Sequence, residues 1–178
     1  MTGALTSATT YAPPGATRAS VTAREFKDVL AHLPSGVTVL TTSGPDGTGM
    51  AGMTASAVCS LSLDPPMILA CAANNSRTLT RIRTTGMLAV NLLREDQAHL
   101  ARRFADPQLD QDARFAATAH HLVDGLPVLD DALAWLACTV EATYPGGDHT
   151  ILTAEVRGLG LGGGPPLLWH NRTFRTLV

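Results

Sequence analysis

The sequence predicts a mainly β fold, an antiparallel β-barrel with a few short helices at its ends. Three observations favour this fold. Short segments rich in β-branched and apolar residues recur along the chain, glycine-containing turns join two pairs of them as hairpins, and strands do not alternate regularly with long helices. At 178 residues, the chain is long enough for one domain that buries its own core.

The first elements follow from local pattern. Residues 22–33 carry apolar side chains three and four positions apart, which predicts an amphipathic helix. Residues 37–42 are strand-like, and the turn residues of 44–49 predict that the next strand folds back on them. That second strand ends at LSLDPP (61–66), because proline has no N–H to donate to a neighbouring strand.

Two continuous apolar runs, 67–73 and 87–93, predict strands that are buried on both faces. In chain order, the remaining elements are a helix opened by NNSRT (74–78), a helix over 95–104, a loop containing Arg114 and Phe115, two long strands (132–144 and 149–161) joined by PGGD (145–148), and a short strand within 166–177.

Composition excludes several classes of protein. Apolar residues make up 45% of the chain and charged residues 16%, which is typical of a folded domain rather than a disordered chain. A net charge of −2 gives no basis for binding nucleic acid or an anionic membrane surface. No apolar run is long enough for a membrane-spanning helix.

We expect a flexible N-terminal tail over residues 1–21, followed by the domain over 22–178. The tail lacks the basic start and apolar stretch of a secretion signal. Cys59, Cys71 and Cys138 lie among apolar residues without CxxC spacing, so we expect reduced core thiols in a cytoplasmic protein.

The sequence contains no convincing example of a familiar catalytic motif. GLGLGG (158–163) matches a dinucleotide-binding pattern, but Gly164 and the two prolines after it cannot open the helix that such a site needs. His120 and His121 are adjacent and would face opposite sides of a strand, so no metal site is expected. Any enzyme activity would therefore rely on a cofactor.

The stretch TASA (54–57) is unusual, because four small residues stand where a strand normally carries bulk. They leave room for a flat ring to approach the backbone, although close packing of the sheet on a helix would also explain them. NNSRT offers a phosphate site made of the helix start, the hydroxyls of Ser76 and Thr78, and the guanidinium of Arg77. The alternative is that Ser76 only caps the helix. Together they describe a planar, phosphorylated ligand such as a flavin nucleotide.

The chain resembles the short-chain flavin reductases that serve two-component monooxygenases. The similar segments occur in the family's order and cover roughly residues 26–177. They are FKDVLAHLPSGVTVLTT, DG, GMTASAVCSLSLDPPMILACAANNSRT, RF, GLPVLDDALAWLACTV, GDHTILTAEV and PLLWHNRTFRTL. Trp169 and His170 stand where the family commonly has tyrosines, and Asn171–Arg172 replaces its more usual Arg-Gly. These residues would shape the nicotinamide side or the dimer contact, which puts the cofactor preference in doubt.

The resemblance implies a split-barrel FMN-binding fold, antiparallel and Greek-key-like, and a homodimer with the flavin near the subunit interface. It implies FMN or FAD as cofactor, NADH or NADPH as co-substrate, and a flavin-dependent monooxygenase as the partner that receives reduced flavin. NADH is the first choice, because no basic cluster for a 2′-phosphate is evident. The implied cofactor-binding residues are Thr54, Ala55, Ser56 and Ala57 at the ring and ribityl chain, Ser76, Arg77 and Thr78 near the phosphate, and Phe115 close to the pocket.

His149, which follows Gly147 and Asp148, is implied to border the nicotinamide as the catalytic residue, with a plain loop histidine as the alternative. Two other functions remain open at this point. One is a flavoprotein on the same barrel without reductase activity, an oxidase resembling the pyridoxamine-phosphate oxidases or a flavin carrier. The other is a ligand-free structural or partner-binding β-domain, in which the small residues only ease packing.

Overall fold

The fold is known from a computed structural model that describes residues 21–44 and 48–177. The expected tail therefore lies, Val21 apart, outside the described residues. The strands are β1 (Ser35–Gly36), β2 (Thr38–Thr42), β3 (Ala51–Ala55), β4 (Val58–Leu63), β5 (Pro66–Ala73), β6 (Met87–Leu92), β7 (His120–Val123), β8 (Leu126–Leu129), β9 (Ala134–Gly146), β10 (His149–Leu161), β11 (Leu168–His170) and β12 (Thr173–Arg175). The helices are α1 (Ala23–Leu30), α2 (Arg77–Thr85), α3 (Ala98–Ala105) and α4 (Gln111–Ala116), with a 3-10 turn η1 (Glu95–Gln97).

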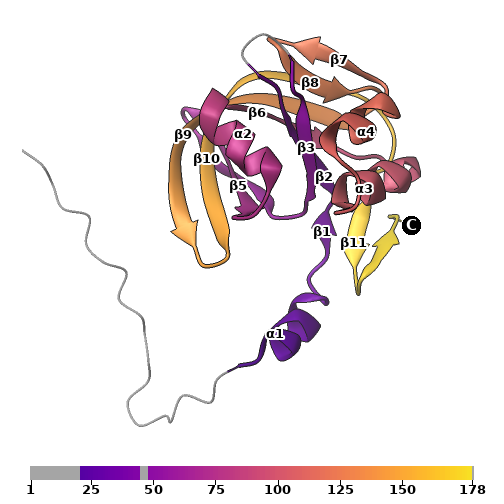
Figure 1. Cartoon of the computed structure of the whole chain (residues 1–178). Coiled ribbons are helices and arrows are strands. Elements are labelled where there is room, and N and C mark those ends of the chain that lie inside the picture. Colours follow the sequence, from indigo (N-terminus) through magenta and orange to yellow (C-terminus); the bar gives the residue numbers. More distant parts are fainter. Residues whose placement is uncertain (1–20, 45–47, 178) are drawn as a thin grey trace, which may run out of the picture.

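The fold is mainly β, as predicted, and its centre is a seven-stranded antiparallel sheet in the order β3-β2-β6-β9-β10-β5-β4 (Figure 1). β9 and β10 are joined through the predicted turn and pair along most of their length. A three-stranded sheet, β1-β11-β12, and a β7–β8 hairpin complete the strands in the described chain.

The prediction of one continuous strand before LSLDPP is wrong. The chain leaves β3 at one edge of the sheet and enters β4 at the other edge after only Ser56 and Ala57. Three residue steps span at most about 10 Å, so the two edges of the sheet come close together at this point. The Cys71 N–H of β5 donates to the Ala57 carbonyl over 2.9 Å, which holds the crossing in place.

Helices cover the region around β2 and β3 (Figure 1). α2 begins at Ser76, whose hydroxyl accepts from the Leu79 N–H, and ends at Gly86 in the left-handed conformation. Its buried side chains, Leu79 and Ile82, pack into the main core with residues of the sheet. α3 and α4 lie against β3 and form a second core cluster around Phe104 and Phe115.

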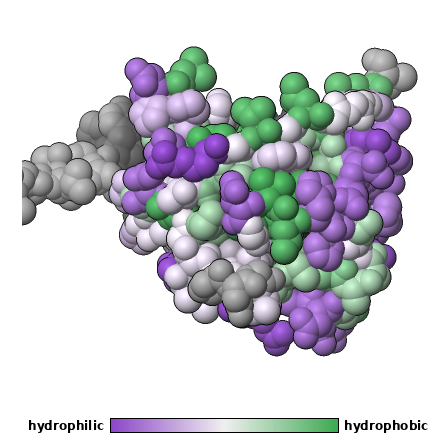
Figure 2. All heavy atoms as spheres, turned by 90° about the horizontal axis from the view of Figure 1, so that it is seen from above, coloured by the Kyte–Doolittle hydropathy of each residue, from purple (hydrophilic) through white to green (hydrophobic). Residues whose placement is uncertain are grey.

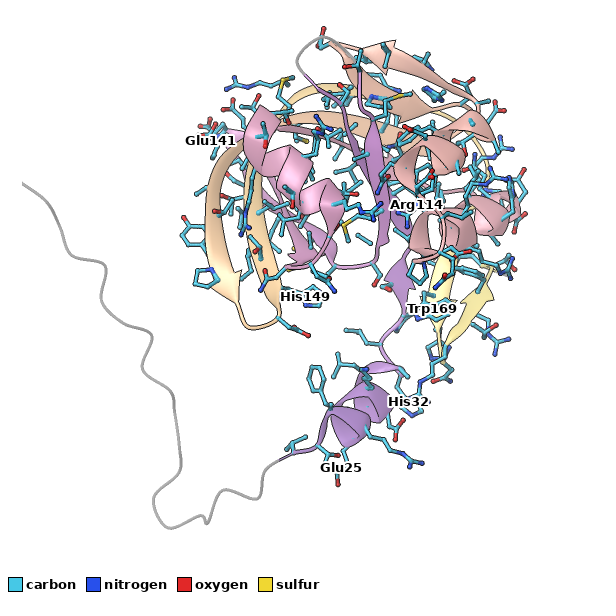
Figure 3. The ribbon with its side chains drawn as sticks, viewed as in Figure 1. Glu25, His32, Arg114, Glu141, His149 and Trp169 are labelled. Atoms are coloured by element: carbon cyan, nitrogen blue, oxygen red, sulfur yellow. The ribbon has the colours of Figure 1, made fainter. Side chains whose placement is uncertain are left out.

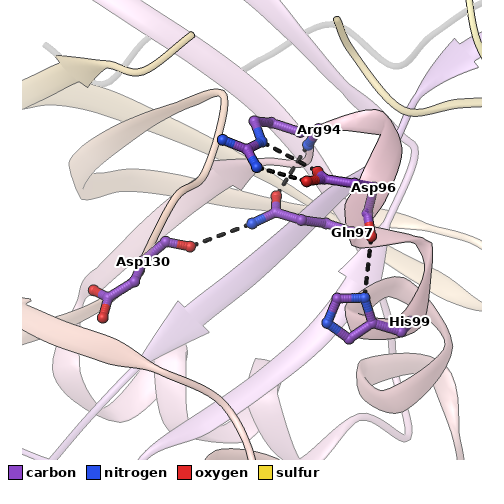
Figure 4. Close-up of polar contacts among 5 residues, drawn as sticks. All are labelled: Arg94, Asp96, Gln97, His99 and Asp130. Carbon is purple, nitrogen blue, oxygen red and sulfur yellow. Dashed lines mark hydrogen bonds and ion pairs between the residues drawn. The ribbon is translucent and has the colours of Figure 1, made fainter. Parts of the chain in front are cut away.

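The start of α3 is fixed by a small polar network (Figure 4). The Arg94 backbone N–H donates to Gln97 Oε1 over 3.0 Å, and Gln97 Nε2 donates to the Asp130 carbonyl over 3.2 Å. Arg94 also forms an ion pair with Asp96 at 2.6 Å, and the His99 ring lies 3.2 Å from the Asp96 carbonyl. These contacts connect η1 and α3 to the segment that follows β8.

The predicted N-terminal helix forms as α1, opened by a capping box between Thr22 and Glu25. Its apolar side does not pack on the body of the chain. The exposed residues are Phe26, Val29, Leu30 and Leu33. Two polar contacts to the β11–β12 turn hold the helix: the Asn171 N–H donates to the Ala31 carbonyl over 2.8 Å, and Arg172 pairs with Asp28.

Several local predictions need correction. Arg114 and Phe115 lie on α4, not in a loop, because Asp110 caps a short helix by accepting from the Ala113 N–H. β5 alternates between buried and half-exposed residues instead of being buried on both faces.

The three cysteines do not share the expected core environment. Cys59 is exposed and Cys71 is half-buried; only Cys138 lies in the core, where burial raises its pKa to about 12.

The glycine pattern GLGLGG serves packing. A Cβ at Gly160 would lie 2.3 Å from Trp135 Nε1, and one at Gly162 would lie 2.3 Å from the Ala132 carbonyl oxygen. Gly160 lies in β10 and Gly162 just after it, so close approach of a ring and a backbone explains both. In the described part of the chain, no helix has the length and apolar character to cross a membrane.

Candidate functional site

Two adjoining cavities lie along β3 and its continuation. We call the first the aromatic cavity; it measures about 430 Å³, and its lining residues include Thr54, Ser56, Ala105, Trp169 and Phe174. The second, the guanidinium cavity, measures about 390 Å³, and its lining residues include Thr54, Ser76, Arg77, Ala105 and Arg114. Thr54 and Ala105 line both, so the two cavities adjoin on the side of β3 next to α3.

The small residues of TASA alternate between this region and the core. Ala55 is buried in the main core cluster, on the opposite side of β3. Thr54 and Ser56 face the aromatic cavity, and the Thr54 hydroxyl donates to the Ala101 carbonyl of α3 over 2.7 Å. Ala57 is exposed and lines neither cavity. Part of the small-residue pattern therefore serves packing, and part opens the aromatic cavity.

The far wall of the aromatic cavity comes from the C-terminal hairpin. Trp169 and Phe174 meet edge to face with ring centroids 5.0 Å apart, and Arg102 of α3 lies 4.9 Å from the Phe174 ring centre. Arg172 also lines the cavity but is already paired with Asp28 of α1. Two aromatic side chains facing the small residues of β3, with hydroxyls and guanidiniums beside them, suit a flat aromatic ring with a polar edge.

The guanidinium cavity suits an anion. Arg77 is exposed, whereas Arg114 is only 8% exposed and donates to the carbonyls of Gly52 at 2.8 Å and Asp106 at 2.5 Å. Burial lowers the pKa of Arg114, the charge of Arg77 adds to this, and Asp106 opposes it. Within residues 21–44 and 48–177, no carboxylate pairs with either guanidinium.

Two buried polar atoms at this end have no partner in the described chain: the Thr78 hydroxyl and Arg114 Nε. A buried polar group without a partner costs about 1–3 kcal/mol. Ser76 caps α2 by accepting from the Leu79 N–H, and it also lines the cavity at the N-terminus of this helix, where the helix dipole favours an anion. The residues present therefore fit a phosphate group at this end and a flat ring at the other.

Gly52 is a structural residue of the site that its sequence pattern did not reveal. Gln111 of α4 accepts from its N–H over 2.7 Å, and Arg114 donates to its carbonyl. A Cβ here would lie 2.6 Å from the Phe104 ring and 3.2 Å from the Phe115 ring. Only a glycine lets α3 and α4 approach the edge strand β3 so closely.

Phe115 itself does not line either cavity. It is 3% exposed and packs edge to face on Phe104, with ring centroids 5.3 Å apart. Its neighbour Arg114 projects into the guanidinium cavity instead (Figure 3). The burial of this arginine and the contact of Gln111 depend on α4, a helix that the sequence pattern does not predict.

His149 lies at the tip of the β9–β10 hairpin (Figure 3). Within a single chain, it lines neither the aromatic nor the guanidinium cavity. It lines a third cavity of about 280 Å³, the hairpin cavity, together with Asn74, Arg83, Thr143, Tyr144, Pro145 and Thr150. Its Nδ1 is 2.7 Å from Asp148 Oδ1, and this hydrogen bond, with the charge of His149, lowers the pKa of Asp148. Among the described residues, no group of three or more His, Cys, Asp or Glu could hold a metal ion.

The sequence and the fold are similar to those of several flavin reductases. The chain is 37% identical over 159 residues to the "NADH-dependent flavin reductase" of a Rhodococcus species, covering 88% of each protein. It is 42% identical over 154 residues to the reductase component of a 4-nitrophenol and 4-nitrocatechol monooxygenase from Rhodococcus opacus, covering 86% of this chain and 80% of the relative.

A solved structure is also similar to this chain over most of its length. The NADH:FAD oxidoreductase of Streptomyces globisporus, determined in complex with NAD and FAD fragments, superposes with a TM-score of 0.81 at 31% identity. The match covers 87% of this chain and 92% of that one. The family described as "flavin reductase like domain" matches residues 30–178. The chain belongs to the family of flavin reductase like domains.

Proposed function

We propose that this protein is an NADH-dependent flavin reductase that reduces FMN or FAD and supplies the free reduced flavin to a partner flavin-dependent monooxygenase. The observation that carries the proposal is the pair of adjoining cavities beside β3, one with aromatic walls and the other lined by two guanidiniums that have no carboxylate partner among the described residues. The names of the Rhodococcus relatives support both the NADH dependence and the oxygenase partner.

The proposed roles of the residues follow from their positions. Thr54 and Ser56, with the backbone of residues 54–57, are proposed to border the ring and ribityl chain, and Ser76, Arg77 and Arg114 to hold the phosphate at the helix start that includes Thr78. When bound here, a flavin would supply the acceptor for the hydride of NADH, and the residues of the site would serve to hold the two rings in contact away from water. Trp169 and Phe174 are proposed to flank the flavin ring in the aromatic cavity.

His149 is proposed to orient the nicotinamide nucleotide from the hairpin cavity. Asp148 holds its Nδ1, which leaves Nε2 as the ring atom available to a ligand. Replacing His149 with alanine should raise KM for NADH or lower kcat. Unchanged kinetics in that variant would remove His149 from the site.

We also propose that the sheet forms a split barrel, and that two copies assemble as a homodimer. The closeness of the two sheet edges at Ser56 and Ala57 supports the barrel. Exposed apolar side chains support the dimer, namely those of α1 together with Leu61 and Leu63 of β4. Figure 2 shows that apolar side chains also reach the surface on the face seen from above. Three free cysteines support a cytoplasmic place of action.

The test is steady-state oxidation of NADH and NADPH with FMN, FAD and riboflavin offered separately to the purified protein. We expect oxidation of NADH to require added flavin, and riboflavin to bind more weakly than FMN because it lacks the phosphate. Thermal stabilisation by FMN would exclude a ligand-free β-domain. A flavin that binds tightly without accelerating NADH oxidation would overturn the reductase in favour of a non-reductase flavoprotein.

A further inference from the structure

The hairpin cavity has no role in flavin-ring or flavin-phosphate binding as proposed above, and its lining combines charged, polar and aromatic side chains. It lies between the last turn of α2 and the tip of the β9–β10 hairpin. Arg83, Tyr144 and His149 contribute a guanidinium, an exposed phenol ring and an imidazole to its walls. A cation beside an aromatic surface is the combination that binds a nucleotide's phosphate and base.

A hydrogen-bonded chain holds the walls of this cavity. Arg83 Nη2 donates to the Thr150 hydroxyl over 2.9 Å, and that hydroxyl donates to Asn74 Oδ1 over 2.7 Å. Asn74 Nδ2 in turn donates to the Gly147 carbonyl over 3.0 Å. Thr150 is only 3% exposed, so the chain is anchored in the interior. Arg83 has no carboxylate partner within residues 21–44 and 48–177, so its charge is free to meet an anion.

The hairpin cavity adjoins the guanidinium cavity through one turn of the backbone. Asn74 lines the first, and the next two residues, Asn75 and Ser76, line the second. These residues form the turn between β5 and α2. Consecutive Cα atoms are about 3.8 Å apart, so a pyrophosphate that leaves one cavity over this turn reaches the other. A mononucleotide such as FMN ends before it.

We infer that the hairpin cavity binds the adenosine 5′-phosphate arm of a dinucleotide, with Arg83 at the phosphate and Tyr144 against the adenine. FAD and NADH both carry this arm, and FMN does not. The inference rests on the proposed function, because it takes the guanidinium cavity as the site of the flavin phosphate. It gives the protein a means to distinguish FAD from FMN by residues far from the flavin ring.

The test compares Arg83→Gln and Tyr144→Ala with Arg81→Gln, a control that removes the same charge from the same helix outside the cavity. Dissociation constants of FAD and FMN are measured by quenching of flavin fluorescence, and that of AMP by calorimetry. We expect Arg83→Gln to weaken FAD and AMP about tenfold or more and FMN less than twofold, because one charge-assisted contact to phosphate is lost. Arg83 and Tyr144 are exposed, and equal melting temperatures confirm that the variants fold.

A second arm of the test identifies the source of the adenylate. If the arm belongs to NADH, Arg83→Gln raises KM for NADH but not for reduced nicotinamide mononucleotide, which lacks it, and leaves the FAD-to-FMN affinity ratio unchanged. FAD and FMN both weakened to the same extent by more than twofold, no loss of affinity for AMP, FAD or NADH, or the same losses in Arg81→Gln would each overturn the inference. The binding constants need no turnover, so a protein that binds FAD but does not oxidise NADH would refute the reductase and still test the cavity.

Discussion

Replacing Gly52 with alanine tests the claim that close packing at β3 builds the site. The new Cβ would lie 2.6 and 2.8 Å from two atoms of the Phe104 ring and 3.2 Å from the Phe115 ring. Both rings are almost fully buried, at 1% and 3% exposure, so neither can turn away into solvent. Something in the core must therefore shift, and overpacking of this kind costs about 1–3 kcal/mol of folding free energy.

The expected result is a lower melting temperature and weaker flavin binding. A loss of about 2 kcal/mol lowers the melting temperature of a domain of this size by about 4–8 °C. Because Gln111 and Arg114 bind the N–H and carbonyl of Gly52, the displaced strand also moves Arg114 relative to the guanidinium cavity. FMN should therefore lose more affinity than riboflavin.

Differential scanning calorimetry and fluorescence titration check both parts. Gly36→Ala is the matched control, since its Cβ would have no neighbour within 4 Å and it also lies in a strand. In a double variant, Phe104→Leu should recover part of the loss, because a smaller side chain faces the new methyl group. A Gly52→Ala protein as stable as the Gly36→Ala control would refute the packing argument.

Three further predictions follow from contacts described above. Arg77→Gln should weaken FMN about tenfold and leave riboflavin unchanged in fluorescence titrations, since only the phosphate meets this side chain; equal losses would place the phosphate elsewhere. In His149→Ala, the pKa of Asp148 measured by NMR should rise back toward 3.8, the value of the free side chain, and an unchanged pKa would argue against the contact. Because folding lowers this pKa, the contact stabilises the protein at pH values above the pKa of the unfolded state. This stabilisation is lost as the pH falls through the pKa of the folded state. At pH 8 the exposed Cys59 should react with a thiol reagent in the native protein, whereas Cys138, with a pKa of about 12, should react only after unfolding, as mass spectrometry would reveal.

Local patterns were enough to predict most of the elements. The helical spacing of residues 22–33, the hairpin turn at 145–148 and the helix start at Ser76 all depend on interactions within a few residues, and all three are confirmed. The helix α4 was missed because its six residues are too few for a repeated apolar pattern. The division of one predicted strand into β3 and β4 was missed because strand pairing depends on partners far away in the sequence.

The site was predictable only in part for the same reason. Thr54, Ser56, Ser76 and Arg77 stand out as residue types, and the structure places all of them on two adjoining cavities. The burial of Arg114 could not be read from the sequence, because it depends on α4 folding against Gly52, 62 residues earlier. The opposite wall of the aromatic cavity comes from the last residues of the chain, which no local pattern connects to TASA.

The attachment of α1 has a thermodynamic consequence. Asp28 and the Ala31 carbonyl contact the turn between β11 and β12. The two strands that this turn joins carry Trp169 and Phe174. Any surface that covers the bare side of α1 therefore acts on the same turn that shapes the aromatic cavity. By linkage, a second copy of the chain that favours one position of that turn changes the affinity of the aromatic cavity for its ligand. The ligand then changes the affinity of self-association by the same factor.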